Sequence, residues 1–377
     1  MNRNNSRLHV LQIGTQLGVG GITRHIVTLT AWMRENGHEV TLAGTSDAWV
    51  NPKTEDHFLE LPTRLVAGEG GGIVARVFYT FLAAAKLRKW LRKNHVDIIH
   101  CHESAPALVA LIARAGKSVP IAVTYHGSEP ERIALFGRIA SRCDLVITPS
   151  NRSAEDLREV GRVPEEKLRV IGLGVKPMPD YPDAEVAALR ENLLGDGTHV
   201  IVTLARLMHQ KGIDILIECV AKLKQSHPGF RFVVAGDGPD AEKLQKLARE
   251  KDVAGHLEFV GRTEKPHLYL QASDLFLLTS RWEALPFSIV EAFQAGTPAV
   301  ATACSGVVEL IDEKVGAVVP IGDVDAICEA VSDVLSDEER RLQMREAARE
   351  LSTEDRFQPD WVHAQFEKTY LSLANRP

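Results

Sequence analysis

Short apolar runs alternate with stretches of helical spacing along this chain, and the alternation begins anew near residue 199. Strands are predicted in the first half at residues 8–13, 39–43, 96–100, 121–124 and 145–148. Strands are predicted in the second half at residues 200–204, 230–235, 257–260, 275–278, 299–302 and 317–319. Strands that are apolar on both faces and separated by helices form parallel sheets that helices cover on both sides. The sequence therefore predicts an α/β protein with two doubly wound, Rossmann-like domains.

A stretch with three prolines separates the two halves. It reads Lys-Pro-Met-Pro-Asp-Tyr-Pro-Asp over residues 176–183, and prolines at this density disfavour a helix and mark a linker. We place the first domain at residues 1–177 and the second at residues 178–360. Two such domains are expected to face a central cleft at the carboxyl ends of their strands, where ligands usually bind.

Composition limits the remaining classes of protein. Apolar residues make up 45% and charged residues 25%, which is ordinary for a globular chain. No apolar run reaches about 18 residues, so no transmembrane helix is predicted. Residues 1–7 are polar and predict no signal peptide, and the five cysteines lack a CxxC pair, which indicates reduced thiols in the cytoplasm. A pI near 6.2 gives no support for a nucleic-acid partner.

The charge is unevenly divided between the halves. Residues 1–178 carry an excess of Lys and Arg, and residues 179–377 carry an excess of Asp and Glu. Six cations surround the apolar stretch 77–91 of the basic half, namely Arg76, Lys86, Arg88, Lys89, Arg92 and Lys93. Such a helix could lie on an anionic membrane, which would place the protein peripherally on the inner face of the membrane. A packed helix with a solvated basic face is the alternative.

A glycine-rich turn follows the first predicted strand and opens a helix. Gly20 and Gly21 would let backbone N–H groups approach a phosphate or a sugar at the positive end of that helix. The spacing matches neither GxGxxG nor a Walker A loop. An ordinary strand-to-helix turn therefore remains the alternative.

Two cations stand near the start of the second half. Arg206 comes just after a predicted strand, and Lys211 opens the next helix. Cations at a strand end and at a helix start form an anion site, because the helix dipole adds to their charge, and a diphosphate would suit it. Two solvated surface cations are the alternative. The turn Gly236-Asp237-Gly238 follows the next strand and would admit a flat ligand, unless it is an ordinary turn.

Two glutamates flank the start of a later helix. Glu283 lies in the loop after the strand 275–278, Pro286 suits the first turn of the helix, and Glu291 lies about one turn further along. A carboxylate can accept two hydroxyl hydrogen bonds, which suits sugars and ribose. A helix-capping role for Glu283 is the main alternative.

His126 lies just past the end of the strand 121–124, at the rim of a parallel sheet. A histidine there can donate to, or accept from, a substrate hydroxyl, although a lone histidine is more often structural. His100, His102 and Glu103 precede it and raise a metal site as an alternative, but no close ligand spacing supports one. No metal is predicted.

These segments, in this order, resemble the family 4 retaining glycosyltransferases, or glycosyl transferase group 1, which have the GT-B fold. The resemblance covers nearly the whole chain. In the first half it is carried by Gly20-Gly21, by residues 97–102 and by His126-Gly127. In the second half it is carried by Arg206, Lys211-Gly212, Gly236-Asp237-Gly238, Val260-Gly261-Arg262, Glu283, Glu291-Ala292, Gly296-Thr297-Pro298, Gly306 and Glu309.

The resemblance implies roles in a donor site on the second domain. Arg206 and Lys211 would bind the donor diphosphate and neutralise the leaving group, and Glu283 would hold hydroxyls of the donor sugar. Glu291 would hold the ribose hydroxyls, and the backbone from Val260 to Arg262 would meet the base. The remaining nucleotide-sugar contacts would be Gly236, Leu285, Pro286 and Phe287.

On the first domain, the resemblance implies that His126 contacts the transferred sugar near the reacting carbon. Gly20 and Gly21 would let the first helix approach the diphosphate and the acceptor. Ala284 departs from the family's usual Gly, and Leu173-Gly174 stands where Asn-Gly is usual. The first departure suggests a loop that is stiffer or shaped for a particular sugar.

In folds of this kind a terminal helix often crosses back onto the first domain, and residues 361–377 have helical spacing. We expect Trp361, Phe366, Tyr370 and Leu373 to anchor it. The domain boundary is therefore expected to be discontinuous.

The implied function is retaining, metal-independent transfer of a sugar from a nucleoside-diphosphate sugar, in this family expected to be a UDP-sugar. The acceptor would be a glycan or a lipid-linked molecule in cell-envelope or extracellular polysaccharide biosynthesis. The sugar nucleotide is a co-substrate, and no further cofactor is expected. A UDP-sugar epimerase-like enzyme of the same fold and a non-catalytic sugar-nucleotide-binding protein are the alternatives.

Overall fold

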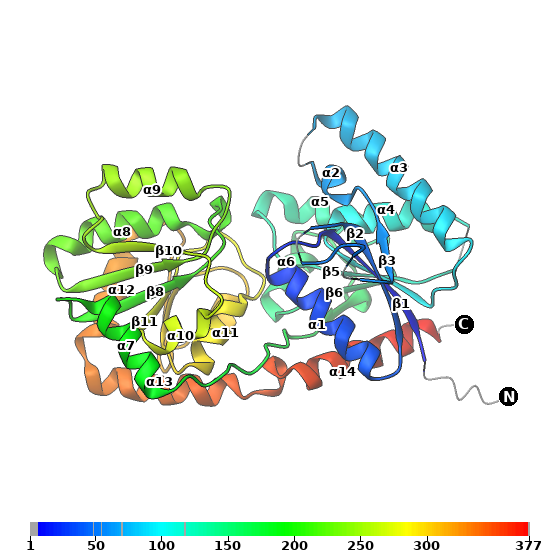
Figure 1. The fold of residues 1–377 in the computed structure, drawn as a ribbon. Helices are drawn as coiled ribbons and strands as arrows, with labels where there is room; N and C mark the ends of the chain where they lie inside the picture. Colours follow the sequence, from blue (N-terminus) through cyan, green and yellow to red (C-terminus); the bar gives the residue numbers. More distant parts are fainter. Residues whose placement is uncertain (1–6, 48, 54, 69–70, 117, 376–377) are drawn as a thin grey trace. The chain divides into compact units, whose positions relative to one another are not determined.

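The computed structural model describes residues 7–47, 49–53, 55–68, 71–116 and 118–375. The chain forms two compact units, one of Met1–Gly174 with Pro359–Pro377 and the other of Val175–Gln358 (Figure 1). Residues 1–6, which contribute to the prediction that no signal peptide is present, lie outside the described residues.

Unit 1 contains a parallel sheet of seven strands in the order β3-β2-β1-β4-β5-β6-β7. The strands are β1 (His9–Gln16), β2 (Glu39–Thr45), β3 (Phe58–Glu60), β4 (Ile98–His102), β5 (Ile121–Thr124), β6 (Leu145–Thr148) and β7 (Leu168–Val170). Every residue of β4, β5 and β6 is buried, as expected for central strands that helices cover on both faces.

Helices cover both faces of this sheet. They are α1 (Gly21–Glu35), α2 (Thr63–Ala67), α3 (Ile73–Leu91), α4 (Ser104–Arg114), α5 (Pro130–Ala140), α6 (Asn151–Glu159) and α14 (Pro359–Ala374). One apolar core contains α1 and α14, and the other contains α2 to α5. The C-terminal helix therefore completes the core of the unit that the N-terminal half begins.

The anchors of α14 are largely those expected. Phe366, Tyr370 and Leu373 are buried in the core that this helix shares with α1. The expectation for Trp361 is wrong, because its side chain is 41% exposed. Val362, one position further along, is fully buried in its place. The apolar stripe of the helix thus begins at Val362.

Unit 2 contains a parallel sheet of six strands in the order β10-β9-β8-β11-β12-β13. The strands are β8 (His199–Leu204), β9 (Phe230–Ala235), β10 (Leu257–Gly261), β11 (Leu275–Leu278), β12 (Ala299–Thr302) and β13 (Gly316–Val319). The helices are α7 (Asp183–Leu194), α8 (Ile213–Ser226), α9 (Ala241–Glu250), α10 (Pro266–Gln271), α11 (Phe287–Gln294), α12 (Val324–Ser336) and α13 (Glu338–Ser352). The predicted α/β class with two doubly wound parallel sheets is confirmed.

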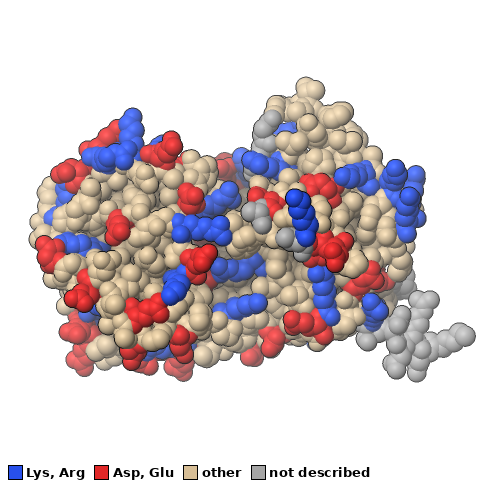
Figure 2. Space-filling view, viewed as in Figure 1, with Lys and Arg blue, Asp and Glu red and all other residues tan. Residues whose placement is uncertain are grey.

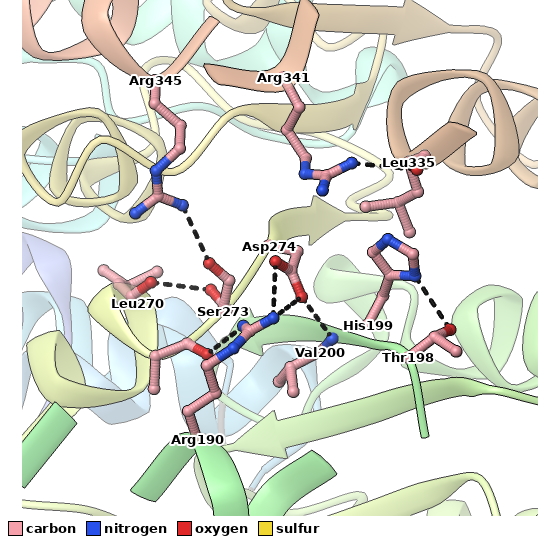
Figure 3. A network of polar contacts seen from close by, with 11 residues as sticks. Arg190, Thr198, His199, Val200, Leu270, Ser273, Asp274, Leu335, Arg341 and Arg345 are labelled. Carbon is pink, nitrogen blue, oxygen red and sulfur yellow. Dashed lines mark hydrogen bonds and ion pairs between the residues drawn. The ribbon is translucent and has the colours of Figure 1, made fainter. Parts of the chain in front are cut away.

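A polar network ties the start of unit 2 to the amino ends of its strands (Figure 3). Arg190 on α7 donates to both carboxylate oxygens of Asp274, at 3.0 and 2.9 Å. Asp274 also accepts a hydrogen bond from the backbone N–H of Val200 on β8. Arg345 on α13 donates to the carbonyl of Ser273, at 3.3 Å. These bonds hold α7 and α13 to the amino edge of the sheet.

One side of helix α3 (Ile73–Leu91) exposes large apolar residues to solvent. Thr80, Ala83, Ala84, Leu87 and Leu91 are its buried residues. On the opposite side, an exposed stripe at spacings of three and four residues runs through Val74, Phe78, Phe81, Ala85, Arg88 and Arg92. The stripe is apolar near the start of α3 and basic near its end. Figure 2 shows Lys and Arg side chains gathered near this end of the helix.

Among the described residues, no helix combines the length and the apolar character that a membrane crossing requires. Helix α3 has the length, but cations occupy its second half, with Lys86, Arg88 and Lys89 all exposed.

Candidate active site

The strand order of each sheet reverses at one point, between β1 and β4 in unit 1 and between β8 and β11 in unit 2. In open parallel sheets, ligands bind outside the carboxyl ends of the strands at such a reversal. Gly20 follows β1, Arg206 follows β8 and Glu283 follows β11. His126 follows β5, the neighbour of β4. The predicted site residues therefore flank the two reversal points.

An ion pair between Lys211 and Glu283 joins two segments at the reversal point of unit 2. Lys211 ends a short 3-10 turn directly before α8, and Glu283 lies in the loop before α11. Ser280 Oγ donates to the same carboxylate oxygen, Oε1, at 2.7 Å. Glu283 is only 7% exposed, so this pair is a fixed element of the site rather than a surface contact.

The loop that carries Glu283 packs against a glycine. A Cβ atom added at Gly306 would lie 1.6 Å from the carbonyl oxygen of Ala284, so only glycine allows this contact. The alternative that Glu283 caps α11 is wrong, because Pro286 occupies the N-cap position and no side chain caps the helix. The carboxylate of Glu283 is instead directed to Lys211 and Ser280.

The start of α8 is favourable for an anion. Its N-cap is Gly212, which has a positive φ of 61° and provides no capping side chain. The acidic residue of its first turn, Asp214, is held by two hydrogen bonds from Arg281, at 2.9 and 2.6 Å. Burial alone would raise the pKa of Asp214, but the hydrogen bonds and charge of Arg281, together with backbone hydrogen bonds at Asp214 and Ile215, hold the pKa below its ordinary value. Arg281 balances the charge of Asp214, so the positive end of the helix and its remaining N–H groups still favour an incoming anion.

Arg206 is exposed and has no ion-pair partner within the described part of the chain. The turn after β9 packs against Ala205, the residue before Arg206. A Cβ atom at Gly236 would lie 1.8 Å from the carbonyl oxygen of Ala205. Gly236 N–H donates to the carbonyl of Gly261, at 2.8 Å, and so joins the turn after β9 to the last residue of β10. Val260 is half-buried and Arg262 is exposed beside this junction.

Glu291 lies on α11 and is 6% exposed. Its Oε1 atom is 3.6 Å from Nε2 of His267 on α10, a residue that the sequence patterns did not single out. Leu285 and Pro286 are buried and Phe287 is half-buried, so contacts from this loop to a ligand would come mainly from its backbone. Only a tertiary contact identifies His267, because nothing in its local sequence marks it.

In unit 1, His126 is hydrogen-bonded to a second histidine. His126 Nε2 is 3.1 Å from Nδ1 of His102, and His102 Nε2 is 3.1 Å from Oε1 of Gln12. His100 contacts Thr124 Oγ1 at 2.7 Å and the Tyr370 hydroxyl at 2.6 Å. The described residues contain no group of three or more His, Cys, Asp or Glu that could hold a metal ion. These histidines therefore form a hydrogen-bonded cluster.

Burial keeps the cluster neutral. Burial lowers the pKa of His126 to about 4, and burial together with the charge of His126 lowers the pKa of His100 to about 3. The pKa values of His102 and His25 are held well below their ordinary values, first by burial and then by the neighbouring histidines. At neutral pH the cluster offers hydrogen bonds without charge.

Gly20 and Gly21 lie at the start of α1, where Gly20 is the N-cap. A Cβ atom at Gly20 would meet no atom within 4 Å, so nothing in the described protein fills the space beside it. The first turn of α1 has no acidic residue and no side-chain cap. Its N–H groups can therefore donate hydrogen bonds to a ligand.

Known proteins resemble both units. The family described as Glycosyltransferase Family 4 matches residues 19–177, and the family described as Glycosyl transferases group 1 matches residues 187–351. The GDP-mannose-dependent alpha-(1-6)-phosphatidylinositol monomannoside mannosyltransferase of Mycolicibacterium smegmatis is 30% identical over 285 residues, covering 71% of this chain and 74% of that protein. The chain belongs to glycosyltransferase family 4.

Further similarities extend over nearly the whole of this family 4 glycosyltransferase. The phosphatidyl-myo-inositol mannosyltransferase of Mycolicibacterium smegmatis is 26% identical over 375 residues, covering 94% of this chain and 91% of that protein. The crystal structure of Anabaena HepE in complex with UDP and glucose aligns with a TM-score of 0.80 at 20% identity, covering 97% of this chain and 100% of that one. The fold is therefore that of the GT-B glycosyltransferases, as expected.

Proposed function

We propose that this glycosyltransferase moves a sugar from a nucleoside-diphosphate sugar to a hydroxyl group of a glycan or lipid-linked acceptor, with retention of configuration. The observation that carries the proposal is the ion pair of Lys211 with the buried Glu283, beside the N-terminus of α8. It sets a cation for a diphosphate next to a carboxylate for sugar hydroxyls. An epimerase-like enzyme or a binding protein of this fold is less well supported, because the chain belongs to a family of transferases.

The donor would bind along the carboxyl edge of unit 2. Arg206, Lys211 and the first N–H groups of α8 would receive the diphosphate, and Glu283 would accept hydrogen bonds from sugar hydroxyls. Glu291 would accept from the ribose hydroxyls, and the backbone of residues 260–262 would meet the base. The exposure of Arg206 and its lack of an ion-pair partner in the described chain suit a side chain that acquires its partner with the ligand.

The chemistry needs stabilisation of the leaving group above all. The bond from the anomeric carbon to the phosphate oxygen breaks, and its electron pair leaves with the diphosphate, where Arg206 and Lys211 would balance the charge. The acceptor oxygen forms the new bond on the same face of the sugar, and its proton passes to the departing phosphate oxygen. Since side-chain cations would supply the charge, we propose a metal-independent reaction. Addition of a chelator is expected to leave turnover unchanged. Loss of turnover on addition of the chelator would contradict a metal-independent reaction.

Two donor bases are open to a direct comparison. We propose a UDP-sugar, which the UDP and glucose bound to the structurally similar Anabaena protein support. The relative that is 30% identical is GDP-mannose-dependent, which favours GDP-mannose as the second candidate. Release of UDP or GDP from each sugar nucleotide, with and without a lipid extract as acceptor, tests the proposal. No release with any donor, under conditions where the protein is folded, would overturn it.

The acceptor side is proposed to be an anionic membrane that α3 contacts. Phe78 and Phe81 are 61% and 60% exposed on this helix, and the same exposed stripe continues into Arg88 and Arg92. An apolar half would enter the acyl boundary while the basic half meets anionic headgroups. A solvated, packed helix explains the basic half alone and leaves the exposed phenylalanines without a role.

Vesicle flotation separates these alternatives. Full-length protein is expected to float with vesicles rich in anionic lipid at low salt, and the double variant Phe78→Ser and Phe81→Ser should lose most of this binding. Leu135→Ser is the matched control, because Leu135 is 54% exposed on α5 and lies off α3. Equal flotation of the double variant and the control would contradict membrane contact through α3.

A further inference from the structure

The histidine cluster of unit 1 lies between the sheet and the pair of helices α1 and α14. Gln12 on β1 is the register partner of His100 on β4, and His102 follows two positions later on the same face. Gln12, His100 and His102 are completely buried. His25 of α1 adds a ring that packs edge-on against His102 and His126, with centroids 5.5 and 5.7 Å away. Within this cluster one line of hydrogen bonds leads from the core to His126, a residue that is half-buried.

The line begins at the amide of Gln12, which makes one hydrogen bond through its nitrogen and one through its oxygen. Its Nε2 group donates to Thr30 Oγ1 at 2.9 Å, which directs Oε1 toward His102. An amide oxygen only accepts, so His102 Nε2 must carry the hydrogen that is donated to it. Since the ring of His102 is neutral, its Nδ1 atom then has a lone pair and no hydrogen.

The same reasoning extends to the next ring. Nδ1 of His102 can only accept, so the hydrogen of the 3.1 Å contact belongs to Nε2 of His126. A neutral His126 protonated at Nε2 has an unprotonated Nδ1. We propose that Gln12 and His102 hold His126 in this tautomer, so that His126 presents a hydrogen-bond acceptor, Nδ1, to a ligand at the carboxyl end of β5.

This inference rests on the proposed function for the identity of that ligand. A neutral acceptor fits a hydroxyl group of the transferred sugar, which can donate. It does not fit a phosphate oxygen, which is itself an acceptor. Nδ1 of His126 has no hydrogen-bond partner in the part of the chain described, and the residue is only half-buried. Gln12 and His102 are thus positioning residues that act through His126.

The tautomer can be measured directly in the full chain without ligand. Nitrogen NMR of protein labelled in its histidine rings distinguishes a protonated from an unprotonated ring nitrogen, and loss of signals in His126→Asn assigns that ring. The expected result is a hydrogen on Nε2 and none on Nδ1, for both His102 and His126 at pH 7. A hydrogen on Nδ1 of His126 would overturn the proposal, whatever reaction the protein performs.

Two substitutions at His102 then test the consequence for catalysis. His102→Asn places an amide oxygen close to where Nδ1 accepts, whereas His102→Leu removes the acceptor and frees the His126 ring to change tautomer. The leucine variant is expected to lose about 10- to 100-fold in kcat/KM, and the asparagine variant to stay within about threefold of wild type. His25→Leu controls for repacking, because neither ring nitrogen of His25 has a hydrogen-bond partner in the described structure.

The outcomes separate this inference from the proposed function. If wild type releases no nucleotide from any donor, the proposed function fails, while the NMR result still decides the tautomer. If wild type is active and His102→Leu changes the His126 tautomer without changing kcat/KM, the positioning role is wrong. If the leucine variant loses activity, the asparagine variant retains it and the tautomer follows the same pattern, the proposal stands.

Discussion

The carboxyl edges of the two sheets differ sharply in their chemistry. In unit 2 the edge is built from charged groups, with Lys211 and Glu283 paired and Arg206 exposed. In unit 1 the corresponding edge ends in neutral histidines, whose pKa values burial lowers. Both edges arise from the same parallel architecture, which fixes where a ligand can bind. The difference teaches that the loops and strand ends decide which part of a ligand each edge can take: a diphosphate needs charge, whereas a sugar hydroxyl needs only a positioned hydrogen-bond partner.

Among changes to the charged edge, removal of the Glu283 carboxylate should have the largest effect on activity. Glu283→Ala is expected to lower kcat by about 10²- to 10⁴-fold, because sugar hydroxyls lose an acceptor that is already fixed by Lys211 and Ser280. Steady-state release of nucleoside diphosphate measures it. Glu264→Ala, a change at an exposed position, should leave kcat unchanged. A loss below about threefold for Glu283→Ala would remove this residue from the site.

Removal of the paired cation should weaken nucleotide binding. Lys211→Ala is expected to raise the Kd for UDP or GDP by about 10- to 100-fold, since a diphosphate loses a charge-assisted partner. It should also lower Tm, because Glu283 is left buried without its cation. Calorimetric titration and thermal unfolding measure both effects. Lys222→Ala, at a cation that is 53% exposed, is the control for loss of a positive charge.

The exposed cation offers a contrast within the same edge. Arg206→Ala is expected to raise the nucleotide Kd about tenfold while Tm in the absence of ligand stays unchanged, because Arg206 has no partner in the described protein to lose. The same two measurements apply. An equal fall in Tm for Arg206→Ala and Lys211→Ala would show that the two cations do not differ as described.

The neutral, buried histidines of unit 1 should make the free energy of unfolding depend on pH. In the unfolded chain histidines titrate near 6.5, whereas in the folded chain His126 remains neutral down to about pH 4 and His100 to about pH 3. Below pH 6.5 the unfolded chain therefore binds more protons. The contribution of these histidines to the free energy of unfolding should be complete above pH 6.5. As the pH is lowered, the free energy of unfolding should fall by up to about 1.4 kcal/mol per pH unit for each buried histidine. Urea unfolding at pH 7.5, 6 and 5 measures this slope. A flat profile between pH 7 and 5 would contradict a neutral, buried cluster.

The fold was predictable because central strands of a parallel sheet must be apolar on both faces. The predicted bounds of β5, β6, β9, β11 and β12 coincide with the observed ones. The strands β3 and β7 were missed. Each is three residues long and pairs with only one neighbour at an edge of the sheet, so its sequence needs no continuous apolar run. Arg169 and Val170 of β7 are exposed for this reason.

The charged residues of the site were predictable one by one, but their pairing was not. Lys211 and Glu283 are 72 residues apart, and only the adjacency of β8 and β11 brings them together. The histidine cluster has a local signal in the sequence, which also raises a metal site as an alternative. His100 and His102 alternate along β4 and so share a face, but their partners Gln12 and Tyr370 come from the two ends of the chain. Such contacts become visible only in the folded structure.

A crystal structure of the full chain with bound UDP or GDP tests the central claim most directly. The account predicts that the β-phosphate lies within hydrogen-bond distance, about 2.7–3.2 Å, of Lys211 Nζ, with the N–H groups at the start of α8 and the Arg206 guanidinium around the diphosphate. A diphosphate held by the histidines of unit 1, or held in unit 2 without contact to either cation, would contradict the division of tasks between a charged and a neutral edge.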